Sequence, residues 1–388
     1  MSYKFPLAFD SWNNDEKQAI FNVVESGFLT MGDKVKEFEQ SFASYIGSKH
    51  AVMVNSGSSA NLLMIASLFY NRDVNKRLKR GDEVIVPAVS WSTTYFPLYQ
   101  YGLKFKFVDI DLETLNFDLQ KLEETVTEKT KLILAVNLLG NPNDFDKIKK
   151  IIGTKNIFLL EDNCESLGAE FKGKKTGTIG KMGTFSFYYS HHISTIEGGM
   201  IVTDDDELYQ ILLCIRAHGW TRNLPNINLI SNKNINDNFL ESFRFVLPGY
   251  NLRPMEISGA TGLEQLKKFP SFLKQRKKNA NVFLNVMKRF DDLLVQKEIN
   301  CSSWFGFSIV IKRSSKRNRT DLVKSLNKIG FECRPVVAGN FANNEVIKYF
   351  DTSHIDKLEN ANWVDKNGLF IGNNHIDMNE AFKELKKL

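Results

Sequence analysis

Two adjacent histidines, His191 and His192, mark the stretch of the chain that is best suited to proton transfer. They follow an apolar, aromatic run that begins at Phe185 and precede a Gly-Gly bend at 198–199, so we expect a strand that delivers them into a turn. An imidazole has an ordinary pKa of about 6.5 and can accept or donate a proton near neutral pH. From these residues alone, histidines that are solvated or satisfied in a core remain the alternative.

Two carboxylates follow one of several short apolar segments that have the composition of buried strands. The run 157–160 leads directly into Asp162 and Glu165. Other runs of this kind lie at 83–87, 105–108 and 131–136. Strands separated by helical stretches predict an α/β fold with a mainly parallel central sheet, in which chemistry gathers at the carboxyl ends of the strands. By itself, a carboxylate such as Asp162 at a strand end is often only a surface cap.

A strand, a small-residue turn and a helix predict an anion site early in the chain. The apolar run 51–54 breaks into Asn55-Ser56-Gly57-Ser58, and a helix is expected over 62–69. Free backbone N–H groups and the positive end of the helix dipole converge at such a turn, although Ser-Gly-Ser would equally cap an ordinary helix. Trp91 lies at the next strand-to-helix turn. From its residue type alone, we expect it to be buried in the core.

The surrounding elements predict two lobes. With 388 residues, of which 43% are hydrophobic, the chain is long enough for a large core and a smaller second one. We expect a large domain over residues 1–265 and a smaller α+β domain over 266–388. Helical spacing covers 14–26, which Gly27 is placed to end, and 34–45. In the smaller domain, strands at 308–311 and 330–334 are expected beside helices at 319–326 and 379–388.

Charge and cysteine content narrow the classes of function. The chain carries 51 Lys+Arg and 45 Asp+Glu, a formal net charge of +6, so a mild attraction for an anionic small molecule fits better than a nucleic acid. The basic run 274–279 predicts a solvated helix face. With no apolar signal core or spanning run, we expect a cytoplasmic protein without a membrane partner. The four cysteines are far apart, so no metal site is expected.

The segment 185–199 resembles the lysine motif of the sugar aminotransferases, which are pyridoxal-phosphate-dependent enzymes of fold type I. In that motif Phe-Ser-Phe is followed by a lysine six positions before Glu-Gly-Gly, and here the residue six positions before Glu197 is His191. Imidazole offers no primary amine to condense with the cofactor aldehyde, but it can still move protons. Ile196 is a second departure, because glycine is usual there. Motifs in the family order cover nearly the whole chain.

The resemblance implies an aspartate aminotransferase-like fold and assigns cofactor-binding roles. Asp162 would keep the pyridine nitrogen protonated, Glu165 would lie near the cofactor's 3-hydroxyl, and Trp91 would stack on the ring. The cofactor phosphate is assigned to Gly57, Ser58, Ser186 and, from the neighbouring subunit, Asn251.

Because Asn251 belongs to a Gly-x-Asn-x-Arg motif that reaches the other subunit in the family, the resemblance also implies a homodimer with a shared active site. Substrate contacts are expected at Met31, in the loop 28–32, and at His218 and Arg222. The segment 216–223 combines cationic and aromatic groups that suit a sugar diphosphate, and by composition it is as readily a solvated loop.

Among nucleotide-sugar enzymes of this fold, histidine in place of the lysine is the mark of 3-dehydratases. One kind needs an iron–sulfur cluster, which the scattered cysteines argue against. The other is metal-free and acts on GDP-4-keto-6-deoxy-D-mannose, and Glu-Asp-Asn-Cys-Glu-Ser and His-Gly-Trp-Thr-Arg-Asn resemble its motifs. The resemblance implies that pyridoxamine 5′-phosphate, formed from pyridoxal 5′-phosphate with L-glutamate, removes the C3 hydroxyl of this GDP-linked sugar and releases ammonia. His191 would act first as base and then as acid, in GDP-L-colitose and O-antigen synthesis.

Two other functions stay open. A sugar 3-aminotransferase with a displaced lysine would give an amino sugar, and Lys181 is the lysine near the motif in sequence. A cofactor-binding pseudoenzyme, acting as a regulator or scaffold, is the second alternative. Such a protein would not need Asp162, Ser186, Trp91 and Asn251 together.

Overall fold

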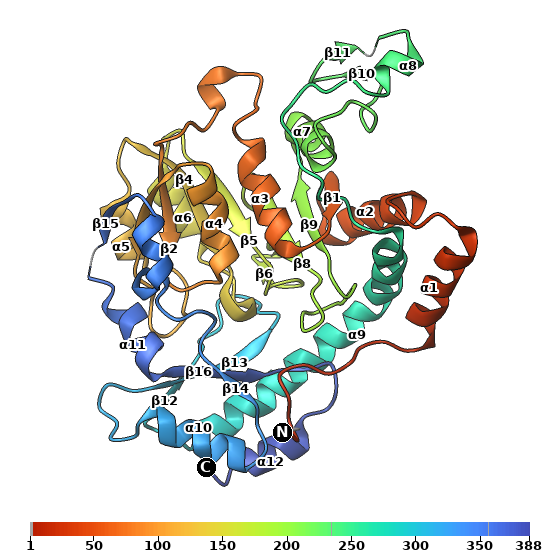
Figure 1. Ribbon diagram of the computed structural model, residues 1–388. Coiled ribbons are helices and arrows are strands. Elements are labelled where there is room, and N and C mark those ends of the chain that lie inside the picture. The colour runs from red at the N-terminus through yellow and green to blue at the C-terminus, as the bar shows by residue number, and fades with distance from the viewer. Residues whose placement is uncertain (1–2, 234, 356) are drawn as a thin grey trace.

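A mixed central sheet organises the chain. The computed structural model describes residues 3–233, 235–355 and 357–388. Within these ranges the sheet has eight strands in the order β1-β9-β8-β5-β4-β2-β3-β15 (Figure 1). The strands are β1 (His50–Val54), β2 (Glu83–Pro87), β3 (Lys104–Val108), β4 (Thr130–Val136), β5 (Phe158–Asp162), β8 (Met182–Ser186), β9 (Gly199–Thr203) and β15 (Thr352–Ile355). Pairing is parallel from β8 to β15, and β9 is antiparallel to both neighbours, which confirms the predicted mainly parallel sheet.

Helices cover both faces of the sheet because its strands alternate apolar side chains between two cores. In β1, Val52 and Val54 belong to one core, whereas Ala51 and Met53 belong to another. The first core includes side chains of α3 (Gly57–Ser67), α4 (Ser92–Gln100) and α7 (Asp206–Arg216). The opposite face is packed by α2 (Asp33–Ile46) and α9 (Glu256–Met287), and further along the sheet by α5 (Leu119–Thr125) and α6 (Phe145–Ile152).

A second, antiparallel sheet forms the smaller lobe. Its order is β12-β13-β16-β14, with β12 (Leu293–Val295), β13 (Gly306–Ile311), β14 (Cys333–Arg334) and β16 (Gly368–Gly372). The helices α10 (Arg319–Lys328) and α12 (Asn379–Leu385) pack there, and both chain ends lie at this lobe (Figure 1). The strand expected over 330–334 is shorter than predicted, since only Cys333 and Arg334 pair with β16, while Phe331 forms an isolated bridge with Phe5.

The helix α9 joins the two lobes. Its Phe269 belongs to the core beside α2, and its Phe283 belongs to the core of the smaller lobe. The predicted domain boundary after residue 265 falls inside this helix. Phe5 packs in the smaller lobe and β15 pairs with β3 of the large sheet, so each lobe contains a segment from the other end of the chain. The boundary itself stays a prediction.

Local capping fixes the helix ends that the sequence predicts best. α1 (Asn14–Ser26) begins with a capping box between Asn13 and Glu16 and ends at Gly27, which has φ 74°. α3 starts at Gly57, five residues before the predicted position, because the Ser56 side chain accepts the Ser59 N–H and the polar turn becomes helical. The strand also lies earlier in the chain than the predicted aromatic run, which begins at Phe185, since β8 starts at Met182 and ends at Ser186.

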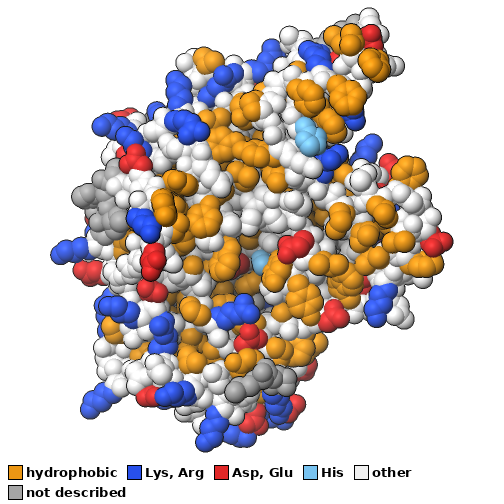
Figure 2. Space-filling view, viewed as in Figure 1, with side chains coloured by type: hydrophobic (Ala, Val, Ile, Leu, Met, Phe, Trp, Pro, Cys, Tyr) orange, Lys and Arg blue, Asp and Glu red, His pale blue; other side chains and the backbone are white. Residues whose placement is uncertain are grey.

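A projecting arm, residues 224–233 and 235–246, leaves the large lobe after α7 (Figure 1). It contains β10 (Ile227–Asn228), β11 (Asn232–Lys233) and α8 (Asn238–Glu241). Phe239, Phe243 and Phe245 are exposed on it, and Figure 2 shows hydrophobic side chains gathered at this end of the molecule. The remaining elements are η1 (Val74–Lys76), η2 (Leu138–Gly140), β6 (Glu170–Phe171), β7 (Lys174–Lys175), η3 (Phe341–Asn343), η4 (Glu345–Tyr349) and α11 (Glu359–Asn367).

Neither a membrane span nor a metal cluster is found in the described ranges. No helix there combines the length and apolar character that crossing a membrane needs. No three His, Cys, Asp or Glu side chains are grouped there to hold a metal ion.

Candidate active site

Seven of the predicted residues line one cavity of about 370 Å³. Five strands of the sheet point in the same direction, namely β1, β2, β4, β5 and β8. β1 joins this group through β9, which is antiparallel to both β1 and β8. The segments after the carboxyl ends of these strands therefore meet at one edge of the sheet. The predicted residues that these segments bring together are Gly57, Ser58, Trp91, Asp162, Glu165, Ser186 and His191.

The first turn of α3 makes an anion-binding end of this cavity. Ser56 caps the helix, and Ser58 Oγ donates to Thr93 Oγ1 at 3.1 Å. Gly57 lies so close to β8 that a Cβ there would be 2.5 Å from Ser186 Cβ and 2.8 Å from Ser186 Oγ. Only glycine lets the free N–H groups of the helix approach the Ser186 hydroxyl in this way, which suits a phosphate group.

Asp162 is a buried carboxylate without a counter-ion. It is 5% exposed, and no Lys, Arg or His of the described residues lies within ion-pair distance of it. Its Oδ2 accepts hydrogen bonds from Asn61 Nδ2 at 2.9 Å and from Thr94 Oγ1 at 2.8 Å, and its Oδ1 accepts from the Cys164 N–H. A buried charge held only by neutral donors favours a cation in the cavity, and a protonated pyridine nitrogen meets that requirement.

Glu165 reaches the cavity from the turn after β5. Its Oε2 accepts the N–H of Leu139 at 2.9 Å, and Leu139 itself has a positive φ of 52° in η2. Burial, together with the negative charge of Asp162, raises the pKa of Glu165 to about 7. At neutral pH this carboxyl group therefore exchanges a proton readily and can donate or accept a hydrogen bond.

His191 projects from the loop between β8 and β9. Its N–H donates to Tyr188 O at 2.9 Å, its ring meets the Phe305 ring edge to face at 5.2 Å, and its Nδ1 has no partner. Burial and the positive charge of Arg276 lower the pKa of His191 to about 4. The imidazole is thus neutral at physiological pH and can accept a proton from a group in the cavity.

Trp91 differs from the prediction made from its own residue type, whereas His192 lies in the core, which is the alternative given for the two histidines. Trp91 is 58% exposed and lines the cavity, so the interpretation as a core residue is wrong. Its exposed ring is free to stack on a flat ligand. His192 is 3% exposed, lies outside the cavity lining, and its Nε2 pairs with Ser303 O at 3.3 Å. Of the two histidines, one faces the cavity and the other is buried in the core, where its Nδ1 has no hydrogen-bond partner.

The predicted residues His218, Arg222 and Asn251 lie outside this cavity. His218 and Arg222 both pack on Trp220, with the Arg222 guanidinium 4.3 Å from its ring centroid and also over Phe243. Asn251 is exposed and its Oδ1 accepts from Arg253 Nε at 3.0 Å. The segment 216–223 therefore forms an ordered cationic and aromatic cluster at the base of the projecting arm. The alternative prediction, a solvated loop, does not describe it.

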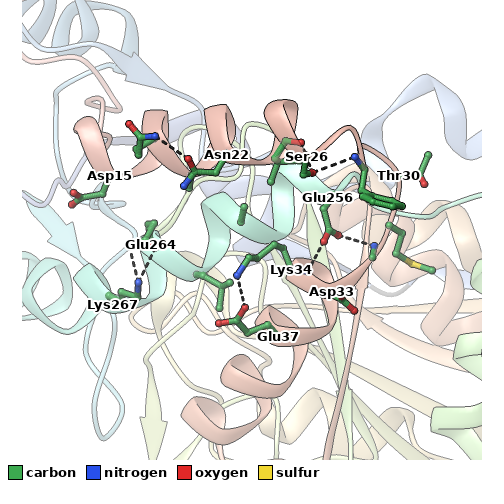
Figure 3. A pocket seen from close by; sticks show the side chains of 18 residues that line it. Asp15, Asn22, Ser26, Thr30, Asp33, Lys34, Glu37, Glu256, Glu264 and Lys267 are labelled. Atoms are coloured by element: carbon green, nitrogen blue, oxygen red, sulfur yellow. Dashed lines mark hydrogen bonds and ion pairs between the residues drawn. The ribbon is translucent and has the colours of Figure 1, made fainter.

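Met31 lines a second, more open cavity of about 710 Å³ between α1, α2 and α9 (Figure 3). There Glu256 accepts the N–H groups of Gly32 and Lys34, and Thr30 pairs with Met255. These contacts fix the loop 28–32 while Phe28 stays 79% exposed. The structure thus places Met31 apart from His191 within one chain.

Several residues in the lining of the His191 cavity were missed from the sequence. Those from the large lobe are Ser56, Asn61, Ser90, Thr93, Thr94, Val136, Leu138, Cys164, Tyr188, Ser190 and Glu197, and those from the smaller lobe are Phe305, Arg334, Val337 and Phe370. Asn61 and Thr94 belong to the two predicted strand-to-helix turns that also contain Gly57 and Trp91. Their position in these turns is the signal by which they could have been predicted to lie near Asp162. No local signal marks the four residues of the smaller lobe.

Lys181 is held away from the site. Its Nζ pairs with Asp205 Oδ2 at 2.6 Å, and the residue lines a separate cavity with Gly177 and Asp204. Among the described residues that line the His191 cavity, there is no lysine. The displaced-lysine alternative therefore lacks its amine.

The fold and these residues define a cofactor-dependent enzyme of the aminotransferase type. The chain belongs to the DegT/DnrJ/EryC1/StrS aminotransferase family, which it matches over residues 10–381. It is 58% identical over 382 residues to the GDP-4-keto-6-deoxy-D-mannose 3-dehydratase of Yersinia pseudotuberculosis, covering 98% of this chain and 97% of that protein.

Solved structures of GDP-4-keto-6-deoxymannose-3-dehydratase are similar along the whole chain. One is a histidine-to-asparagine variant with bound GDP-perosamine, with a TM-score of 0.97, 58% identity, and coverage of 99% of both chains. Another holds a trapped PLP–glutamate geminal diamine, with the same TM-score, identity and coverage.

Proposed function

We propose that this protein removes the C3 hydroxyl of GDP-4-keto-6-deoxy-D-mannose in a reaction that depends on pyridoxal 5′-phosphate and pyridoxamine 5′-phosphate. The product is GDP-4-keto-3,6-dideoxy-D-mannose, with L-glutamate as amino donor and ammonia released. The observation that carries this proposal is a neutral imidazole, His191, in a cavity whose described lining contains no lysine. A site of this kind can move protons without holding the cofactor covalently.

The similar proteins support the same substrates. A relative 58% identical over nearly the full chain carries the name of this 3-dehydratase. Structures at the same identity hold GDP-perosamine in one case and a PLP–glutamate adduct in the other. A GDP-linked sugar, the cofactor and L-glutamate are therefore the ligands that we assign to this chain.

The cavity residues fit the cofactor at both of its ends. The first turn of α3 with Gly57, Ser58 and Ser186 would hold the phosphate, and the uncompensated carboxylate of Asp162 would pair with the protonated pyridine nitrogen. The exposed ring of Trp91 would cover one face of the pyridine. Glu165, with its pKa near neutrality, would bond the 3-hydroxyl.

Bound there, pyridoxamine phosphate supplies an amine for the C4 ketone of the sugar and a ring that takes up an electron pair. His191 then performs both proton transfers. As the neutral base, its imidazole accepts a proton from carbon, and as the resulting imidazolium it donates that proton to the departing C3 oxygen. General acid and base catalysis of this kind contributes about 10²- to 10⁴-fold. The Phe305 ring packs edge to face against His191 and limits water on that side of the imidazole.

Arg334 provides the cationic group that L-glutamate requires. It lines the cavity from β14 of the smaller lobe and is the one Arg or Lys among the described lining residues. Its present partner is Glu332, 3.2 Å away, and the Arg334 side chain is 63% exposed, so the guanidinium is free to exchange that partner for a substrate carboxylate.

A homodimer with shared active sites is part of the proposal. His218, Arg222 and Asn251 lie outside the His191 cavity of their own chain, on surfaces that also expose Phe243 and Met255. A second copy that buried these surfaces would bring the cationic cluster to a neighbouring cavity, where it would bind the diphosphate of the nucleotide sugar. The role in GDP-L-colitose and O-antigen synthesis, and the cytoplasmic location, stay predictions from the family resemblance.

The decisive experiment follows ammonia and product mass. Purified protein is mixed with pyridoxal phosphate, L-glutamate and GDP-4-keto-6-deoxymannose. Ammonia release together with a sugar that lacks one oxygen is the expected result. An amino sugar without ammonia would mean a 3-aminotransferase, and cofactor binding without any product would point to another nucleotide sugar as substrate or to a pseudoenzyme.

A further inference from the structure

A buried arginine stands behind the catalytic cavity. Arg276, on α9, is 4% exposed although it belongs to the basic run 274–279 that was predicted to be solvated. Its Nη1 donates to the carbonyl oxygens of Trp304 at 3.4 Å, Phe305 at 3.1 Å and Asn373 at 2.8 Å, while its Nε has no partner. No carboxylate of the described residues lies within ion-pair distance of it. An uncompensated buried cation is costly, which calls for an explanation beyond packing.

The carbonyls that bind Arg276 belong to the wall of the site. Phe305 packs its ring against His191, and its N–H donates to Leu139 O at 3.0 Å. Leu139 in turn donates its N–H to Glu165. Arg276 therefore fixes, from the side of α9, the same short segment that contacts His191 and the anchor of Glu165 on the cavity side.

The guanidinium also acts on His191 through its charge. Burial and the charge of Arg276 lower the pKa of His191, of the neighbouring His192 and of His375. The other ionisable groups that face the cavity around His191 are Asp162, Cys164, Glu165, Tyr188, Glu197 and Arg334. Burial is the larger cause of the His191 pKa of about 4, and the positive charge of Arg276 is the second cause.

We propose that Arg276 is a positioning residue for the dehydration: its uncompensated guanidinium anchors the Trp304–Phe305 backbone behind His191 and places a positive charge on that side of the imidazole. This inference rests on the proposed function of His191 as a base. A neutral residue of similar length at position 276 would still fill the space and bond one carbonyl, but it would no longer oppose a positive charge on His191.

The test measures the protonation of His191 directly. NMR titration of ¹³C-labelled histidine in the purified protein resolves the six histidines, and the His191→Asn variant identifies the signal. Arg276→Gln removes the charge, Arg276→Lys keeps it but loses the planar fork, and Arg289→Gln removes an exposed arginine just beyond the same helix as a matched control.

In the wild type, the NMR signal of His191 should show a neutral imidazole well below pH 6. Because burial is the larger cause of the low pKa and remains in the variant, we expect Arg276→Gln to raise the pKa of His191 by a measurable shift of up to about one unit, and to move the acid limb of the kcat/KM profile by the same amount. Arg276→Lys should leave the pKa low while lowering kcat, and Arg289→Gln should change neither. An ordinary His191 pKa near 6.5 in the wild type, or equal pKa values in the Gln, Lys and wild-type proteins, would overturn the proposal.

The outcomes separate this inference from the proposed function. If Arg276→Gln fails to fold, Arg276→Met supplies a second neutral side chain of similar length, and a His191 pKa equal to the wild-type value in that variant would overturn the proposal. Ammonia release with a His191 pKa that does not respond to Arg276 would leave the dehydratase in place and remove the role of Arg276. A low His191 pKa that depends on Arg276, without ammonia release, would support the role of Arg276 and contradict the proposed dehydratase function.

Discussion

The Phe305 ring meets the His191 imidazole edge to face, with centroids 5.2 Å apart and an interplanar angle of 63°. Phe305 belongs to the segment that leads into β13 of the smaller lobe, and His191 belongs to the loop after β8 of the large sheet. The contact therefore joins the two lobes at the place where the proposed proton transfers occur. Docking of the smaller lobe is part of what builds the catalytic site.

His191→Lys should restore a covalent link to the cofactor. The substitution places a primary amine in the cavity where the family carries its lysine. We expect borohydride to fix the cofactor onto the chain, giving a mass increase that peptide mapping assigns to the substituted position. His191→Asn, treated in the same way, is the control and should gain no mass. If neither variant retains cofactor covalently, position 191 does not face the cofactor aldehyde.

Asp162→Asn should separate cofactor chemistry from folding. The amide keeps the shape and the hydrogen bond from Thr94, but it cannot stabilise a protonated pyridine nitrogen. We expect turnover to fall by at least about 100-fold. The cofactor-free variant should melt at the same or a higher temperature than the wild type, because an uncompensated buried charge is removed. Unchanged turnover would contradict the role of Asp162.

Gly57→Ala should weaken cofactor binding through a steric conflict with Ser186. The added Cβ would lie 2.5 Å from Ser186 Cβ, so the first turn of α3 must move away from β8. Titration of pyridoxal phosphate by absorbance should show a loss of affinity of at least about tenfold. The double variant Gly57→Ala with Ser186→Gly relieves the contact and should recover the thermal stability, although not the hydroxyl group at the phosphate end. A double variant as unstable as the single one would show that another contact is responsible.

Glu165→Gln should change the pH dependence of stability. The folded-state pKa of Glu165 is raised from 4.5 to about 7, so its contribution is fully present below pH 4.5 and is lost as the pH rises through 7. The glutamine variant lacks this dependence. In protein without added cofactor, its unfolding free energy relative to wild type should improve by up to about 3 kcal/mol between pH 4.5 and pH 8. Glu197→Gln, at an exposed carboxylate of the same cavity, is the control and should show no such trend.

The features that the sequence predicts best are those determined by neighbouring residues, such as helix caps and strand ends. The ends of α1 follow from the Asn13 and Glu16 capping box and from Gly27, and Asp162 and Ser186 stand where strands of a parallel sheet end. The start of α3 was misplaced because a polar turn capped by Ser56 can itself be helical.

Long-range packing places the rest. Phe305 and Arg334 enter the cavity only when the smaller lobe docks, and Arg276 is buried because carbonyls of distant segments accept its hydrogen bonds. A run of charged residues carries no mark of such partners. The positions of His218, Arg222 and Asn251 outside the cavity likewise depend on a second chain in our proposal.

The central claim is that His191 carries out the proton transfers of a dehydration. The most direct measurement is ammonia release by wild type and His191→Asn with pyridoxal phosphate, L-glutamate and GDP-4-keto-6-deoxymannose, while absorbance reports the bound cofactor. His50→Asn, a change at a histidine paired with Asp206 on the surface, is the matched control. We predict ammonia in proportion to deoxygenated sugar for wild type and the control, and bound cofactor without ammonia for His191→Asn. Near-native ammonia release by His191→Asn would contradict the account.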